Sequence, residues 1–104
     1  MKTASVFVHG KLAGRLEELE PGRSYRFVYQ IGYAGPPVSL TMPTTLSEYT
    51  FDRFPPFFEG LLPEGVMLEG LLKQNKIDKL DYFSQLMAVG GDLVGAVTVK
   101  EVAP

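Results

Sequence analysis

Strict alternation of large apolar residues with other residues between Ser24 and Tyr33 limits what this 104-residue chain can fold into more than any other feature. Every second position of that stretch is aromatic or aliphatic, namely Tyr25, Phe27, Tyr29, Ile31 and Tyr33. A period of two is typical of a β-strand that buries one face. We therefore predict a strand over 24–33. We expect its aromatic face to lie in the core, because a chain this small has few other large residues to bury.

Shorter stretches with the same period predict further strands. Residues 5–8 and 12–19 flank His9, Gly10 and Lys11, where glycine suits the positive φ of a tight hairpin. Residues 38–42 alternate apolar and polar positions after a break of glycine and prolines, and the run 94–102 alternates near the end of the chain. The sequence thus predicts four strands before residue 43 and one final strand.

Between these strands the apolar residues take the spacing of helices. Pro55 and Pro56 suit the start of a short helix, in which residues 57 and 61 and residues 58 and 62 form apolar pairs. A later helix is predicted over Lys79–Val89, with Asp78 as N-cap and Gly90 available to end it. Its expected buried stripe is Leu80, Phe83, Leu86 and Met87.

A helix between these two is predicted from Pro63 and Glu64 to about Asn75. Its expected buried stripe is Met67, Leu68, Leu71 and Leu72. The opposite side of this helix carries Val66, Glu69, Gly70 and Lys73. Val66 is then an apolar residue on a polar face, which makes it a candidate for contact with another molecule.

The order of four strands, three short helices and one strand indicates an α+β fold. Consecutive strands are expected to pair as an antiparallel, barrel-like meander of about five strands. The helices are inserted before the last strand, which must return to the same sheet. No linker, repeat or low-complexity segment interrupts residues 1–104, so we predict one domain.

Composition excludes several classes of function. The chain has no cysteine, so disulfides, thiolate nucleophiles and zinc-thiolate sites are ruled out. Its one histidine, His9, lies in the predicted hairpin turn, and we expect no metal and no cofactor. A pI of about 5.3 argues against direct binding of nucleic acid, and no apolar run is long enough to cross a membrane. We expect a cytoplasmic protein with Met1 as its natural start.

The remaining candidates for chemistry have simpler explanations. Asp52, Glu59 and Glu64 could form a carboxylate pair of the glycosidase type, but all three also suit helix starts. The glycine run 90–95 lacks the lysine of a phosphate loop and leads from helix to strand. No catalytic residue is predicted, which leaves a partner-binding or regulatory module. Residues 34–72 carry one arginine and five acidic residues, a charge of −4 that would attract a basic partner surface.

Two motifs carry a resemblance to a known family. Segment 57–65 reads FFEGLLPEG, and segment 89–97 reads VGGDLVGAV. Together with DYF at 81–83 and LTMP at 40–43, they resemble the N-terminal subdomain of HipA-type serine/threonine kinases. That family typically shows F-F-x-N-L-L-P-[DE] and V-G-R-D-x-x-G-A-[VL]. Gly60 and Gly91 depart from this pattern, standing where the family often has asparagine and arginine.

The resemblance covers essentially the whole chain and implies a function. In HipA the kinase's phosphate loop, catalytic aspartate and metal ligands follow this subdomain, so the resemblance implies no enzyme here. The chain resembles HipS-type antitoxins, small separately encoded versions of the subdomain. That implies binding to a HipT-like kinase toxin, with a HipB-like DNA-binding protein as a further partner in a ternary complex.

For the kinase-binding residues we predict the acidic segment around the first motif. Segment 62–70 is expected to restrain or obstruct the kinase active site, since acidic side chains suit a cleft that holds phosphates. The predicted contacts are Glu59, Glu64, Gly65, Val66, Met67 and Glu69. Two alternatives stay open: a structural N-terminal subdomain within a full-length HipA kinase, and a corepressor that assists HipB.

Overall fold

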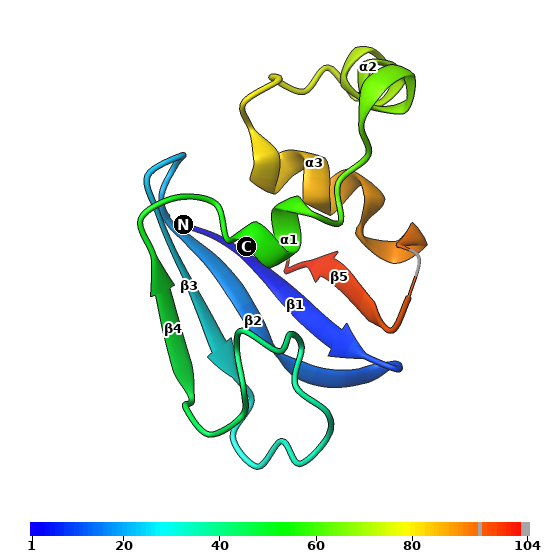
Figure 1. The fold of residues 1–104 in the computed structure, drawn as a ribbon. Helices are drawn as coiled ribbons and strands as arrows, with labels where there is room; N and C mark the ends of the chain where they lie inside the picture. The colour runs from blue at the N-terminus through cyan, green and yellow to red at the C-terminus, as the bar shows by residue number, and fades with distance from the viewer. Residues whose placement is uncertain (94, 103–104) are drawn as a thin grey trace.

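The computed structural model describes residues 1–93 and 95–102, which form a five-stranded antiparallel sheet with helices inserted before the last strand (Figure 1). The strands are β1 (Lys2–Val8), β2 (Lys11–Glu20), β3 (Ser24–Tyr29), β4 (Glu48–Phe51) and β5 (Val97–Glu101). Strands β1 to β4 form a meander and β5 returns to pair with β1, in the order β4-β3-β2-β1-β5. The predicted α+β meander is confirmed. The barrel-like closure is wrong, because β4 and β5 form the two edges of an open sheet.

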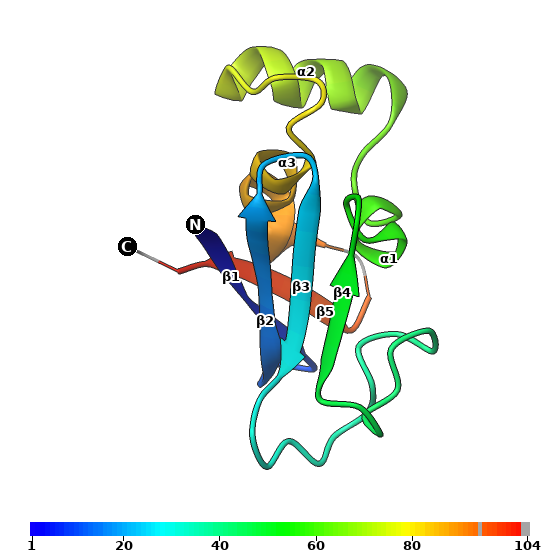
Figure 2. The same ribbon diagram turned by 90° about the vertical axis from the view of Figure 1, so that its left-hand side faces the viewer.

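Three α-helices and one 3-10 helix lie between β4 and β5. They are α1 (Pro56–Glu59), α2 (Gly65–Asn75), α3 (Tyr82–Val89) and the 3-10 helix η1 (Gly90–Asp92). Helices α1 and α3 pack into the core through Phe58, Phe83 and Leu86. Helix α2 buries no residue and lies beyond the ends of the strands, with α3 between it and the sheet (Figures 1 and 2).

The core lies on one face of the sheet. Phe27 is fully buried and stands opposite Leu16 on β2 and Tyr49 on β4. Its ring packs edge-on against Tyr29, with the ring centres 4.8 Å apart. Apolar residues at alternate positions of β1 and β5 complete this face: Ala4, Val6, Val8, Val97 and Val99. The hairpin between β1 and β2 turns at Gly10, at positive φ as predicted, and His9 before it also has a positive φ.

The aromatic strand is shorter than its pattern. It ends at Tyr29, and Ile31 is 97% exposed instead of buried. The chain turns after Gln30, whose carbonyl accepts a hydrogen bond from the Tyr33 amide. Position 32 is a glycine at φ +81°, a conformation that a strand does not tolerate. The alternation therefore predicted the first three residues of the buried face, Tyr25, Phe27 and Tyr29, correctly and failed where the turn begins.

The predicted strand over Val38–Met42 is also wrong. Both end residues are buried, but the segment forms only an isolated bridge between Ser39 and Met42. The Tyr29 hydroxyl accepts from the Val38 amide and donates to the Met42 carbonyl, so a side chain replaces the sheet ladder there. The fourth strand is β4, a four-residue edge strand that we did not predict.

Two helices and the last strand begin or end at residues other than those predicted. Helix α1 stops at Glu59, before the expected apolar pairs are complete. Helix α3 begins at Tyr82, because Asp81 is its N-cap and accepts a hydrogen bond from the Ser84 amide at 3.1 Å. Leu80 therefore precedes the helix and is exposed. The last strand begins at Val97, and Val94, its predicted first residue, lies outside the described residues.

Gly90 lets η1 close against the outer edge of β5. The amide of Val102 donates to the Thr3 carbonyl, and Val99 stands opposite Val6, so by alternation the Val99 carbonyl faces away from β1. A Cβ on Gly90 would lie 2.2 Å from that carbonyl oxygen. Only glycine permits this approach. The close approach of η1 to β5 thus explains why the second motif has glycine at position 90.

Candidate partner-binding site

The predicted contact segment lies at one end of the molecule, where the chain leaves α1 and forms α2 (Figure 1). Leu61 and Leu62 are partly buried against the core and anchor the connection. Gly65 has φ +59°, a left-handed conformation that favours glycine and turns the chain sharply into α2. The helix rests on the body through one side only, where Leu68, Leu71 and Leu72 are half-buried.

Two apolar side chains of α2 face solvent. Val66 is 83% exposed, as its place on the polar face predicted. Met67 is 76% exposed, so its predicted place in the buried stripe is wrong. At about 100° per residue, Met67 lies on the flank of the stripe, and the body does not extend far enough to cover it. Exposed large apolar residues at neighbouring positions are typical of contact surfaces.

The acidic residues of the segment are free of ion pairs in the described part of the chain. Glu59, Glu64 and Glu69 are all exposed, and no lysine or arginine there lies within 4.0 Å of them. Glu64 occupies the N-cap position of α2, but its side chain accepts no hydrogen bond from the helix. The carboxylate of Glu64 therefore does not cap the helix and is free to contact a partner.

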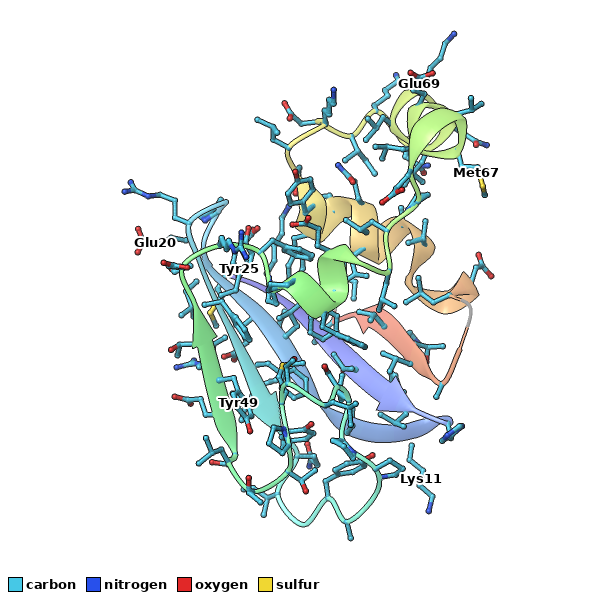
Figure 3. The ribbon with its side chains drawn as sticks, viewed as in Figure 1. Lys11, Glu20, Tyr25, Tyr49, Met67 and Glu69 are labelled. Carbon is cyan, nitrogen blue, oxygen red and sulfur yellow. The ribbon has the colours of Figure 1, made fainter. Side chains whose placement is uncertain are left out.

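The six predicted residues do not share one face. Met67 and Glu69 leave α2 in different directions (Figure 3). Glu59 ends α1, and Glu64 and Gly65 lie at the entry to α2. The residues instead surround the first turn of α2, so a partner that contacts Met67 directly would meet Glu69 only at its margin.

An apolar groove that sequence reasoning missed adjoins Met67. Its volume is about 390 Å³, and it is lined by Gly60, Leu61, Pro63, Met67, Val89, Asp92 and Leu93. Residues 60, 61 and 63 come from the first family motif, and residues 89, 92 and 93 from the second. The signal that could have found the groove was therefore the convergence of the two motifs, which lie about 30 residues apart in the chain.

Asp92 is the one charged residue that lines this groove. It is exposed, and within the described residues it forms no ion pair. The groove thus combines an apolar floor with a carboxylate at its margin. Such a site suits the long side chain of a lysine or arginine, or an apolar side chain that lies next to one of these residues.

A second cluster of charges lies on the sheet, away from this groove. The Glu17 carboxylate is 6% exposed and accepts hydrogen bonds from Arg26 at 2.5 Å and Arg15 at 3.0 Å. Burial alone would raise the pKa of Glu17, but the two guanidinium groups lower it below its usual value. The hydrogen bond to Glu17 raises the pKa of Arg26. This cluster serves to keep a buried carboxylate paired.

The described residues contain no group of three or more histidine, cysteine, aspartate or glutamate side chains that could hold a metal ion. Asp52, Glu59 and Glu64 lie on different connections: after β4, at the end of α1 and before α2. Across residues 1–93 and 95–102, no helix has the length and apolar character needed to span a membrane. The groove and the first turn of α2 are the surface that we consider as a candidate contact site.

Fold and surface together define a small α+β domain with an exposed groove beside the first turn of α2. Residues 4–100 match the model of the HipA N-terminal domain family, so the chain belongs to that family. An uncharacterised protein of Haemophilus influenzae (strain ATCC 51907 / DSM 11121 / KW20 / Rd) is 33% identical over 101 residues, which are 97% of this chain and 93% of that protein. A solved structure described as the N-terminal domain of HipA toxin has a TM-score of 0.76 and 30% identity, covering 99% of this chain and 94% of that one.

These matches confirm the resemblance carried by the two motifs. The matched family is the small N-terminal domain of HipA, which is distinct from its kinase domain. The groove lies where the two motifs meet, so the motifs of this family combine to form a surface as well as a core.

Proposed function

We propose that this chain is a HipS-type antitoxin that binds a HipT-like serine/threonine kinase and inhibits it by docking near the active site. The observation that carries the proposal is the exposed first turn of α2 in a member of the HipA N-terminal domain family. Val66 and Met67 stand in solvent there, beside a groove formed by both motifs. Neighbouring exposed apolar residues beside an apolar groove are typical of a surface that binds another protein.

Charge supports a position near the nucleotide cleft of the kinase. Glu59, Glu64 and Glu69 surround the exposed turn, within a region of charge −4. A cleft that binds nucleotide must be basic enough to hold phosphates, so carboxylates at this surface would favour docking there. The inserted segment would then block either nucleotide or protein substrate.

The test is co-expression with a HipT-like serine/threonine kinase from the same organism, scored by growth. The double variant Glu64→Lys with Val66→Asp reverses one charge and makes one apolar contact polar. It should bind the kinase at least 100-fold more weakly, equivalent to about 2.7 kcal/mol, and fail to protect. A matched control is Glu101→Lys with Leu40→Asp, since Leu40 is 93% exposed and Glu101 lies on an edge strand.

Three results decide the proposal. Loss of protection by the α2 variant alone, with unchanged circular dichroism and Tm, supports the assigned surface. Equal protection by the α2 variant and the wild type sinks the site assignment. If the wild type neither binds nor protects, the antitoxin role is wrong.

A second candidate is a structural subdomain within a full-length HipA kinase. It is favoured by the likeness to the N-terminal domain of HipA toxin over 99% of this chain. The reading frame after the codon for Pro104 separates the two proposals. A stop codon supports a separate antitoxin, whereas an open frame that encodes kinase motifs supports the structural role.

A further inference from the structure

A cavity of about 330 Å³ lies at the end of the sheet where β1 starts, β2 turns into β3 and α3 begins (Figure 1). None of its lining residues belongs to the groove beside α2. They are Lys2, Glu18, Pro21, Gly22, Tyr25, Leu80 and Asp81. Sites for small ligands have volumes of about 300–1,000 Å³, so this cavity is large enough for one side chain or one small molecule.

The Glu18 carboxylate in this cavity has no positively charged partner. Glu18 is 5% exposed, and no cationic group of the described residues lies within 4.0 Å of its oxygens. The Tyr25 hydroxyl donates to Oε2 at 3.3 Å, whereas Oε1 accepts no hydrogen bond from the part of the chain that the structure describes. A buried carboxylate normally has an ion pair or several hydrogen bonds, because removing its charge from water is costly. Oε1 is therefore an available acceptor in the wall of the cavity.

Lys2 is the one cationic residue among those that line the cavity, and its ammonium group is bound to α3 instead. Lys2 stands opposite Glu18 in the β1–β2 register, but its Nζ lies 3.8 Å from Asp81 Oδ2 and donates to the Ser84 hydroxyl at 3.1 Å. The lining groups thus carry two negative charges and one positive charge. The charged groups of neighbouring segments do not line the cavity: the α-amino group of Met1, Glu20, Arg23, Asp78 and Lys79. The Glu18 carboxylate is therefore accessible to a further cation.

The Tyr25 hydroxyl lies in the field of both carboxylates. Burial raises the pKa of Tyr25, and the charges of Glu18 and Asp81 raise it further, although the hydrogen bond from the Gly22 amide lowers it. The two carboxylates thus act together at the wall of the cavity. A positively charged group placed there would be stabilised by the same field.

The loop before α3 forms a fixed apolar wall on another side of the cavity. Gln85 is 1% exposed, and its side-chain amide donates to the backbone carbonyls of Asp78 at 3.2 Å and Lys79 at 2.9 Å. Leu80, which this loop carries, is 73% exposed and lines the cavity together with Pro21. An apolar wall beside a carboxylate suits a ligand whose short alkyl chain ends in a positive charge.

We propose that this cavity binds an alkylamine, with its ammonium group on Glu18 Oε1 and its alkyl chain against Leu80 and Pro21. The geometry favours ammonium over guanidinium. A guanidinium group binds a carboxylate best through both oxygens, and here the Tyr25 hydroxyl already occupies Oε2. An ammonium group is a compact charge and needs only one oxygen. Two sources carry such a group, a lysine side chain of a bound protein and a free aliphatic amine, and neither depends on the antitoxin function proposed above.

The experiment is a heteronuclear NMR titration of the whole chain with butylammonium chloride at neutral pH, compared with sodium chloride at equal ionic strength. The amide signals of Gly22 and Ser84 should shift and saturate, because these amides bond to Tyr25 and Asp81 in the cavity. Butanol has the same alkyl chain without a charge and should cause no saturable shift. Butylguanidinium should bind about threefold more weakly than butylammonium.

Two single substitutions should change the affinity for butylammonium in opposite directions. Glu18→Gln keeps the shape of the side chain but removes its charge, so binding should weaken about tenfold or more. Lys2→Met removes the cation that lines the cavity, so binding should strengthen about threefold. Glu20→Gln is the matched control, since it makes the same change at an exposed position outside the cavity, and should leave Kd within about twofold.

Loss of binding in Glu18→Gln, with unchanged circular dichroism and tighter binding in Lys2→Met, supports the site. The proposal is wrong if the wild type shows no saturable shift, or if folded Glu18→Gln binds as tightly as the wild type. Should Glu18→Gln fail to fold, unchanged or weaker binding in Lys2→Met overturns the proposal on its own. A lysine capped at both termini separates the two sources: tighter binding than butylammonium indicates a lysine of a protein, and weaker binding indicates a free amine.

Discussion

Replacing Gly90 by alanine should destabilise the domain more than any change of similar size on its surface. The new Cβ would lie 2.2 Å from the Val99 carbonyl oxygen and 2.9 Å from its carbonyl carbon. Ordinary contact begins near 3.4 Å, so η1 and β5 must separate by about 1 Å. Both partners are backbone, and neither can rotate away as a side chain would. Overpacking of this kind costs about 1–3 kcal/mol, and we expect the upper end.

The loss is measurable as a fall in Tm. For 104 residues the entropy of unfolding is about 220 cal/mol/K, so about 3 kcal/mol lowers Tm by about 14 °C. Gly91→Ala is the matched control, because its Cβ meets nothing within 4 Å and its φ is not positive. That variant should leave Tm unchanged or raise it by a few degrees. Equal Tm values for the two variants would refute the close approach of η1 to β5.

Two further changes test the sheet. Glu17→Gln should lower the free energy of unfolding at pH 7 by about 1–3 kcal/mol, because it removes the charge that pairs with Arg26. The lowered pKa of Glu17 means that its stabilisation is complete above the ordinary pKa of 4.5 and is lost as pH falls through the folded value. Denaturant titrations from pH 7 to 2 should therefore show a shallower acid loss for the variant than for the wild type. Tyr29→Phe should cost about 2 kcal/mol and speed hydrogen exchange at the Val38 amide, whereas Tyr33→Phe, whose hydroxyl is exposed, should change stability by less than about 0.5 kcal/mol.

Prediction from sequence worked where one physical signal dominates. The alternation of Tyr25, Phe27 and Tyr29 identified the buried face of β3, because a period of two leaves little choice for such large residues. It failed at Ile31, where a glycine turn ends the strand although the pattern continues. Segment 38–42 failed for a related reason. The Tyr29 hydroxyl bonds to the backbone of Val38 and Met42 at the two ends of this segment, and a tertiary contact of that kind is invisible in local periodicity.

The candidate site was predicted only in part, for reasons of tertiary position. Local pattern identified Val66 as exposed, since an apolar residue on a polar helix face is recognisable without a structure. Met67 could not be placed, because its burial depends on how far the body extends beneath α2. The groove is formed by two segments that lie about 30 residues apart in the chain. The part of Asp92 and Leu93 in it could therefore be recognised only from the three-dimensional structure.

Helix α2 contributes little to the stability of the domain, although we propose that it binds the partner. The sheet, α1, α3 and the loops that carry Val38, Met42 and Phe54 supply the buried core, and α2 supplies no buried residue. Substitutions of Val66 or Met67, which are exposed on α2, should therefore change partner binding with little effect on Tm, whereas Gly90→Ala should lower Tm and leave the affinity of the folded fraction near that of the wild type. A helix with few buried contacts also has a small free energy of local opening. Part of the binding energy would then be spent on fixing α2, so a substitution that stabilises the free helix without touching the partner should tighten binding.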